Sequence, residues 1–286
     1  MIRNNIKKIH IHPILIVFIL ISFLTGTFFE LGIILSIVFI HELGHFVTAA
    51  FFKWRIRRIM LWVFGGVMET EEHGNRPIWE EALVIIAGPF QHVVIYFVIL
   101  IMSGMQFLPA SVIELIFYYN TVILLFNLLP VWPLDGGKLL FLFLSSQFSF
   151  KKAYHFIILF SMCMSIFLLL LQLLVFPFTL SALLIMLFLF MENRAEWKHR
   201  YFVFMRFLIK RYEGESSVNG IKSIVLPHNS SLMDVFSLFK RQKKHAVYIT
   251  FPDHKRIMMD ESDCLRNYFY LKHYNKTMGE IAENTG

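Results

Sequence analysis

Long apolar stretches dominate the first two thirds of the chain. Four of them have the length of a single membrane-spanning helix: 13–29, 31–52, 82–102 and 112–129. A further apolar region, 153–191, is too long for one span, and the helix-breaking tract 172–179 divides it in two. We therefore expect an α-helical polytopic membrane protein with about six transmembrane helices.

Basic residues stand at the ends of the first two apolar runs. Arg3, Lys7 and Lys8 precede the first run, and Lys53 and Arg55 follow the second. Cytoplasmic loops carry the excess of Lys and Arg, so this pattern predicts that both termini are cytoplasmic. The second run follows almost at once, so we expect the first to be an uncleaved span rather than a signal peptide.

The stretch 55–69 has a different pattern, rich in branched and aromatic residues. It predicts a β-hairpin or membrane-dipping loop, with a turn signal at Gly65-Gly66. The edge of such a hairpin could pair with an extended peptide, which makes both glycines candidate substrate-binding residues. The alternative is a plain amphipathic connector. The polar residues that follow, Glu69, Glu71, Glu72 and His73, are expected to form a solvated face.

The composition changes abruptly after Met191. The charged and aromatic segment that follows is typical of a helix at the membrane surface. The remainder predicts a small α/β domain, with strands at 221–226, 245–250 and 257–259, a helix capped near Ser231 and a last helix starting near Glu261. We expect a membrane domain over 1–192, an interfacial helix and linker over 193–217, and a cytoplasmic domain over 218–286.

Composition agrees with the membrane assignment. Of 286 residues, 57% are hydrophobic and 16% charged, and the mean hydropathy is +0.61. The net charge of +7 does not indicate nucleic-acid binding, because the basic residues flank apolar runs. The two cysteines, Cys163 and Cys264, are expected to be isolated thiols, and they form no metal-binding pattern.

The candidate chemistry begins with His41-Glu42-Leu43-Gly44-His45, inside the second apolar run. Residues four apart share one face of a helix, so His41 and His45 can present two imidazoles to one metal ion, with Glu42 beside the open coordination position. A carboxylate in a membrane span costs roughly 2.5 kcal/mol or more. Such an acidic residue between two histidines indicates a functional site rather than a chance match.

A second informative stretch is 127–138, which includes Pro130, Pro133, Gly136 and Gly137. These residues make a continuous helix improbable. Irregular backbone at membrane depth occurs only where it is buried in protein or lines a water-filled cavity. Asp135 is the acidic residue that such a broken helix can bring to the metal.

With both stretches in hand, the chain resembles the site-2 protease family of intramembrane zinc metalloproteases. The resemblance implies that His41, His45 and Asp135 hold Zn²⁺, and that Glu42 is the catalytic acid-base group. It also implies that Asn127 and Pro133 contact the substrate strand. Leu128 and Leu134 depart from the family's second motif. The segment 87–89 is followed by Phe90-Gln91-His92 and lacks the Asn that the family often has after it, so the resemblance gives His92 no role.

The six spans, the β-like loop and a C-terminal segment similar to a CBS domain are most like the sporulation branch of this family. That branch implies a membrane-associated substrate, the sigma factor precursor pro-sigma-K, in the mother-cell membrane around the forespore. It also implies membrane inhibitor proteins. ATP at the CBS-like unit and a homo-oligomer are further expectations. One CBS-like unit would normally need a partner unit to form a nucleotide pocket, which weighs against ATP binding by a single chain.

A membrane metal transporter or sensor with a regulatory cytoplasmic domain is the alternative class. Transporters often show paired broken helices in related halves, whereas this sequence shows one ligand helix and one broken helix without a repeat. A catalytically dead scaffold is disfavoured, because Glu42 is retained beside both histidines.

Overall fold

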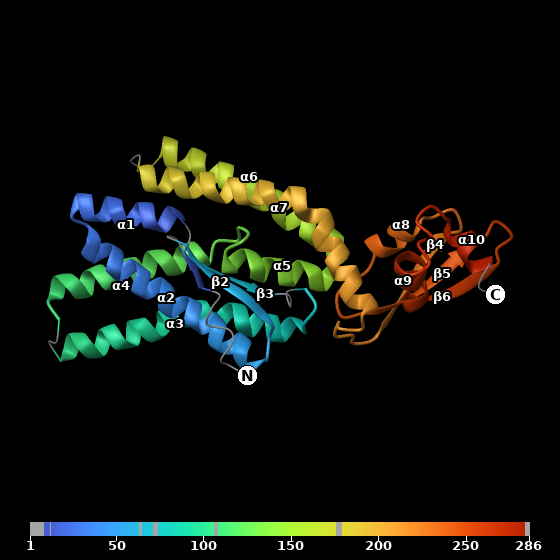
Figure 1. The fold of residues 1–286 in the computed structure, drawn as a ribbon, viewed down its shortest axis with the longest axis horizontal. Coiled ribbons are helices and arrows are strands. Elements are labelled where there is room, and N and C mark those ends of the chain that lie inside the picture. The colour runs from blue at the N-terminus through green and yellow to red at the C-terminus, as the bar shows by residue number, and fades with distance from the viewer. Residues whose placement is uncertain are drawn as a thin grey trace. The chain divides into compact units, whose positions relative to one another are not determined.

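The computed structural model describes residues 9–11, 13–62, 65–70, 74–105, 108–175 and 179–283. These residues form two compact units (Figure 1). The first comprises 1–73, 79–139 and 164–189, and the second comprises 74–78, 140–163 and 190–286.

Seven helices form most of residues 13–212: α1 (Pro13–Thr25), α2 (Phe28–Phe51), α3 (Ile78–Gly104), α4 (Ala110–Asn127), α5 (Asp135–Gln147), α6 (Phe150–Leu174) and α7 (Leu180–Tyr212). Within the described residues, α2, α3, α4 and α6 are long and apolar enough to cross a membrane. The expectation of a mostly helical membrane protein is therefore confirmed. The count of six spans stays a prediction, because α1 has only 13 residues.

Helix α7 differs from its expected form. The sequence predicts a span that ends near Met191 and a separate surface helix after it. In the structure one unbroken helix runs from Leu180 to Tyr212, so the change in composition falls inside it.

The core of the first unit lies where α2 packs on α3. Ile37 of α2 and the α3 residues Ile95 and Ile99 form one buried cluster, against which α4 side chains pack. Nearer the end of α2, Ala49, Trp54 and Val84 form a second cluster. Trp54 also donates a hydrogen bond from Nε1 to Glu80 Oε1 over 2.7 Å, which satisfies a polar group that burial would otherwise leave unpaired.

A three-stranded sheet accompanies these helices. Strand β1 (Ile9–Ile11) pairs in parallel with β2 (Ile56–Trp62), and β2 pairs antiparallel with β3 (Gly65–Thr70). The predicted hairpin is therefore present, but the turn is not where the sequence indicates. Gly65 and Gly66 lie in β3, where they pair with Trp62 and Leu61. Residues 71–73 of the predicted solvated acidic face lie outside the described residues.

The predicted break before Asp135 is confirmed. Helix α4 ends at Asn127 and α5 begins at Asp135, and residues 128–134 connect them. Gly136 makes this connection compact, because a Cβ at that position would lie 2.1 Å from the carbonyl oxygen of Leu128. Without that glycine, the connection could not lie against the first turn of α5.

The second unit contains a sheet in which β4 (Ile221–Pro227) is parallel to β5 (Lys244–Thr250), and β5 is antiparallel to β6 (Arg256–Asp260). Helices α8 (Leu232–Ser237), α9 (Glu261–Phe269) and α10 (Met278–Glu283) accompany it. The three predicted strands and the cap at Ser231 are confirmed. Ser231 and Asp234 form a reciprocal capping box at the start of α8.

A buried ionic cluster joins the end of α7 to this sheet. Arg211 contacts both carboxylate oxygens of Glu261, with Nη2 2.9 Å from Oε2. His245 donates to the same Oε2 from its backbone N–H and its Nδ1, both over 2.8 Å. Burial raises the pKa of Glu261, but the hydrogen bonds from His245 and Arg211 outweigh it, so the pKa lies below its usual value.

Candidate metal centre

Three donor atoms from two helices converge in the first unit. His41 Nε2 and His45 Nε2 lie 3.1 Å apart, and each lies 3.1 Å from Asp135 Oδ2. All three side chains are buried. The structure therefore brings together the two histidines of α2 and the aspartate at the start of α5, which are separated by about ninety residues of sequence.

The donor set fits a zinc ion. Zinc with tetrahedral ligands at about 2.0–2.1 Å separates neighbouring donor atoms by about 3.3 Å, close to the edges of this triangle. Within the described residues, Asp135 Oδ2 is buried and has no hydrogen bond. A buried carboxylate oxygen without a donor needs a positive partner, and a cation between the three atoms supplies one.

Each imidazole has a hydrogen-bond partner on the side opposite the donor triangle, at its Nδ1. His45 Nδ1 lies 2.8 Å from the carbonyl oxygen of Val84, an acceptor only, so Nδ1 carries the proton. His41 Nδ1 lies 3.1 Å from His92 Nε2, and His92 Nδ1 lies 2.8 Å from Asn120 Oδ1. If His41 presents its Nε2 lone pair to a metal, its Nδ1–H donates to His92, and His92 donates to Asn120. This arrangement is typical of the supporting shell of a metal-bound histidine.

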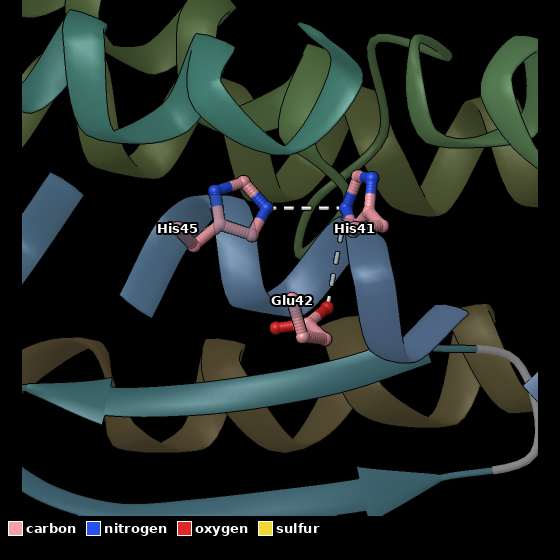
Figure 2. Close-up of side chains that lie close together, drawn as sticks. All are labelled: His41, Glu42 and His45. Atoms are coloured by element: carbon pink, nitrogen blue, oxygen red, sulfur yellow. Dashed lines mark hydrogen bonds and ion pairs between the residues drawn. The ribbon is translucent and has the colours of Figure 1, made fainter. Parts of the chain in front are cut away.

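Glu42 lies close to the triangle but outside it. Its Oε1 is 4.0 Å from His41 Nε2, farther than any edge of the triangle. Geometry alone also groups His41, Glu42 and His45 as a set that could hold a metal. We favour Asp135 as the third donor because its oxygen is equidistant from both imidazoles. Figure 2 shows the two imidazoles on one side of α2 and Glu42 directed toward a strand on the other.

Helix α3 closes the site on the imidazole side. A Cβ at Gly88 would lie 2.3 Å from His45 Nε2 and 2.8 Å from His41 Cε1. Only a residue without a side chain lets the α3 backbone approach both rings so closely. Small residues at such helix contacts are common in membrane proteins.

Lys138 lies on the same face of α5 as Asp135. Its Nζ is 3.2 Å from Asp135 Oδ1, so the two oxygens of one carboxylate have different neighbours. The spacing of three residues is a helical ion-pair signal that the sequence contains. By contrast, the contacts of His92 and Asn120 join distant segments, and no local pattern indicates them.

The residues predicted to contact substrate come from separate elements and do not form a close cluster like that of the three donor atoms. Asn127 ends α4, where its side-chain amide donates over 3.0 Å to the carbonyl oxygen of Ile123 in the same helix. Pro133 lies in the connection 128–134 just before Asp135, and Gly65 and Gly66 open β3. Strand β3 contacts α2 and lies at one edge of its sheet.

Comparisons with known proteins match this chain to one family of peptidases and to relatives named as proteases. A model of peptidase family M50 matches residues 29–110 and 105–171. The chain is 40% identical over 277 residues to stage IV sporulation protein FB of Bacillus subtilis, with 96% of each chain covered. A putative zinc metalloprotease of Synechocystis is 36% identical over 123 residues, which are 40% of this chain and 32% of that relative. The solved site-2 protease of Methanocaldococcus jannaschii superposes with a TM-score of 0.52 at 26% identity, covering 66% of this chain and 89% of that one.

Proposed function

The chain belongs to peptidase family M50, and we propose that it cleaves its substrate within the membrane with a zinc ion held by His41, His45 and Asp135. It is an integral membrane metallopeptidase. The observation that carries the proposal is the triangle of three buried donor atoms at 3.1 Å, with Glu42 beside it. Relatives of the chain that are named zinc metalloproteases support zinc as the metal.

Zinc bound there would lower the pKa of a water molecule and polarise the scissile carbonyl. Glu42 Oε1 is placed to accept the proton of that water and to return it to the leaving amine. Hydrogen bonds from Nδ1 of His45 to Val84 O and from Nδ1 of His41 to His92 would keep both imidazoles in the tautomer that presents Nε2. The buried setting keeps bulk water away from these groups, so their charges interact strongly.

The substrate would bind as an extended strand. A membrane helix hides its carbonyl groups in internal hydrogen bonds, so a protease must unwind it first. The edge of β3 offers unpaired backbone groups to an added strand, and β3 contacts the helix that carries Glu42. We assign Gly65 and Gly66 to one side of this strand, and Asn127 and Pro133 to the other.

We further propose that the substrate is the precursor of a sporulation sigma factor, of the pro-sigma-K kind, whose pro-sequence is removed at the mother-cell membrane. The extent of the match to stage IV sporulation protein FB supports this substrate. Both termini would then face the cytoplasm of the mother cell, and membrane inhibitor proteins would control the enzyme.

For residues 218–286 we propose a single CBS-like unit. A nucleotide pocket would need a second unit, so ATP binding would require two chains to associate. Measuring ATP binding and molecular mass on the same detergent-purified sample tests this directly. Binding by a strictly monomeric protein would contradict it.

The central test is co-expression of a pro-sigma-K-like substrate with the wild type, Glu42→Gln or Asp135→Asn, followed by gel analysis and zinc measurement on the purified proteins. We expect no cleavage in either variant, with zinc retained in Glu42→Gln and reduced in Asp135→Asn. Glu30→Gln is a matched control, because Glu30 also lies on α2 but belongs to its first turn. Cleavage by Glu42→Gln at the wild-type rate would refute the role of Glu42, and metal transport without cleavage would favour a transporter.

A further inference from the structure

The second unit contains a cavity, lined by basic and aromatic side chains, that the proposed proteolytic reaction does not use. It has a volume of about 310 Å³, which is within the usual range for small-ligand sites. Residues from the start of α6 and the charged half of α7 line it: Lys151, His155, Lys198, Arg200, Tyr201 and Phe204. Every lining residue belongs to the same compact unit.

The cavity carries three permanent positive charges without matching acids. Among the described residues, no ion pair to a carboxylate involves Lys151, Lys198 or Arg200. Lys151 and Arg200 contact aromatic rings instead, and Arg200 also donates to the backbone carbonyl oxygen of Trp197. Lys151 Nζ lies 5.5 Å from the ring centre of Phe204, and the Arg200 guanidinium lies 4.2 Å from that of Trp197.

Two acidic side chains of the same unit, Glu196 and Asp234, accept hydrogen bonds from other groups. Glu196 Oε2 accepts a hydrogen bond from the Tyr154 hydroxyl over 2.6 Å. Asp234 accepts from the backbone N–H and the hydroxyl of Ser231 in the capping box of α8. The cavity thus presents three cationic side chains without a carboxylate ion pair among the described residues, and it is suited to a ligand that brings its own negative charge.

The position of the cavity along the helices indicates which kind of anion it would bind. Helix α6 is a candidate membrane span, and the cavity lies at its first residues. Helix α7 changes from an apolar to a charged sequence at Glu192, six residues before Lys198. Both features place the cavity at the boundary between hydrocarbon and water, where phospholipid headgroups lie.

Apolar side chains are exposed on the same two helical segments. Phe156 and Leu159 of α6 are 53% and 47% exposed, and Phe202 of α7 is 67% exposed. A soluble phosphate has no apolar part to contact these surfaces, whereas the acyl chains of a lipid would cover them. Basic pockets between membrane helices are known to bind anionic lipid headgroups.

We propose that this cavity binds the phosphodiester headgroup of an anionic membrane phospholipid, such as phosphatidylglycerol. Lys151, Lys198 and Arg200 pair with the phosphate, and the Tyr201 hydroxyl donates a further hydrogen bond. The exposed side chains of α6 and α7 contact the acyl chains. The bound lipid would then remain attached to this unit, unlike the surrounding membrane lipids that exchange rapidly.

The test is a titration of the full-length protein in mixed detergent micelles with phosphatidylglycerol, read by native mass spectrometry as an apparent Kd. For Lys151→Gln/Lys198→Gln we expect an affinity about tenfold lower or more, because two cationic contacts are lost. The matched control is Lys152→Gln/Arg194→Gln, which removes two exposed charges from the same helices outside the cavity. This control should bind like the wild type. If the double variant does not fold, Lys198→Gln alone should weaken binding about threefold or more.

Two further titrations identify the ligand. Phosphatidylcholine should bind much more weakly than phosphatidylglycerol, and inorganic phosphate should compete only at far higher concentration. Equal affinity for phosphatidylcholine would overturn the anionic assignment, and phosphate binding as tight as lipid would overturn the lipid assignment. Equal losses in the cavity variant and its control would show that only overall charge matters.

Discussion

His92 Nε2 lies 3.1 Å from His41 Nδ1, on the side of the imidazole opposite the metal site. His92 is fully buried and is held in turn by Asn120, through Nδ1 to Oδ1 over 2.8 Å and from Nδ2 to the carbonyl oxygen of His92 over 3.1 Å. Three residues of α2, α3 and α4 thus form one hydrogen-bonded chain that ends at a proposed zinc ligand. His92 is a positioning residue in this arrangement.

Replacing His92 by Leu should lower zinc affinity about 10- to 100-fold, because the His41 ring loses the partner that fixes its orientation and tautomer. Zinc affinity by competition with a chelating dye measures this directly. Asn120→Leu should produce a similar loss, and the two effects should not add in the double variant.

Thr121→Val provides a control in the same turn of α4. The Thr121 hydroxyl bonds to Tyr96 and Phe117 rather than to the metal site. The zinc affinity of the Thr121→Val variant should match that of the wild type. Additive effects of His92→Leu and Asn120→Leu would contradict a single chain of hydrogen bonds.

Gly88→Ala should damage the metal site without changing any polar group. The added methyl would lie 2.3 Å from His45 Nε2, so α3 or the imidazole must move. We expect destabilisation of about 1–3 kcal/mol, together with reduced zinc content and cleavage. Gly104→Ala, at the end of the same helix with no atom within 4 Å of its Cβ, should leave both unchanged. Wild-type zinc content in Gly88→Ala would show that the two helices are not packed this closely.

Asn127→Ala distinguishes a substrate contact from a metal ligand. The side chain lies at the end of α4, one connection away from Asp135. We expect slower cleavage with normal zinc content, because the donor triangle does not include Asn127. Cleavage should be measured at several substrate concentrations, since lost substrate binding raises KM. A loss of zinc equal to that of Asp135→Asn would assign the residue to the metal site instead.

The cluster of Arg211, His245 and Glu261 predicts a pH dependence in the second unit. The folded state lowers the pKa of Glu261 below 4.5, so its contribution to stability is present above that pH and is lost as the pH falls through the folded pKa. Glu261→Gln should destabilise the unit by about 3 kcal/mol at neutral pH, because a buried arginine loses its partner. The difference from the wild type should shrink in acid.

Hydrogen exchange of the β4–β6 backbone, measured from pH 7 downward, tests this prediction once the intrinsic pH dependence of exchange is corrected. Asp263→Asn is the matched control, because Asp263 is an exposed acid on the same helix as Glu261. It should change stability by no more than about 0.5 kcal/mol. An equal difference between Glu261→Gln and the wild type at all pH values would exclude the assigned ionisation.

Local patterns in the sequence indicated most of the helices and most of the proposed metal site, although the span end predicted near Met191 falls inside α7. The spacing of His41 and His45 follows from the helical period, and the prolines and glycines of 127–138 require the break that precedes Asp135. The strands of the C-terminal unit and the cap at Ser231 depend on similar short-range preferences. Caps, strand patterns and helical spacing depend on residues that are close together in the sequence. They can therefore be recognised from a single sequence.

Tertiary structure alone decided the rest. The approach of Gly88 to the imidazoles, the chain from His41 through His92 to Asn120, and the cavity between α6 and α7 each join segments far apart in the sequence. The placement of Gly65 and Gly66 in β3 depends on the pairing register with β2, which glycine content does not fix. Packing brings these groups together, and packing depends on the whole set of long-range contacts rather than on any local pattern.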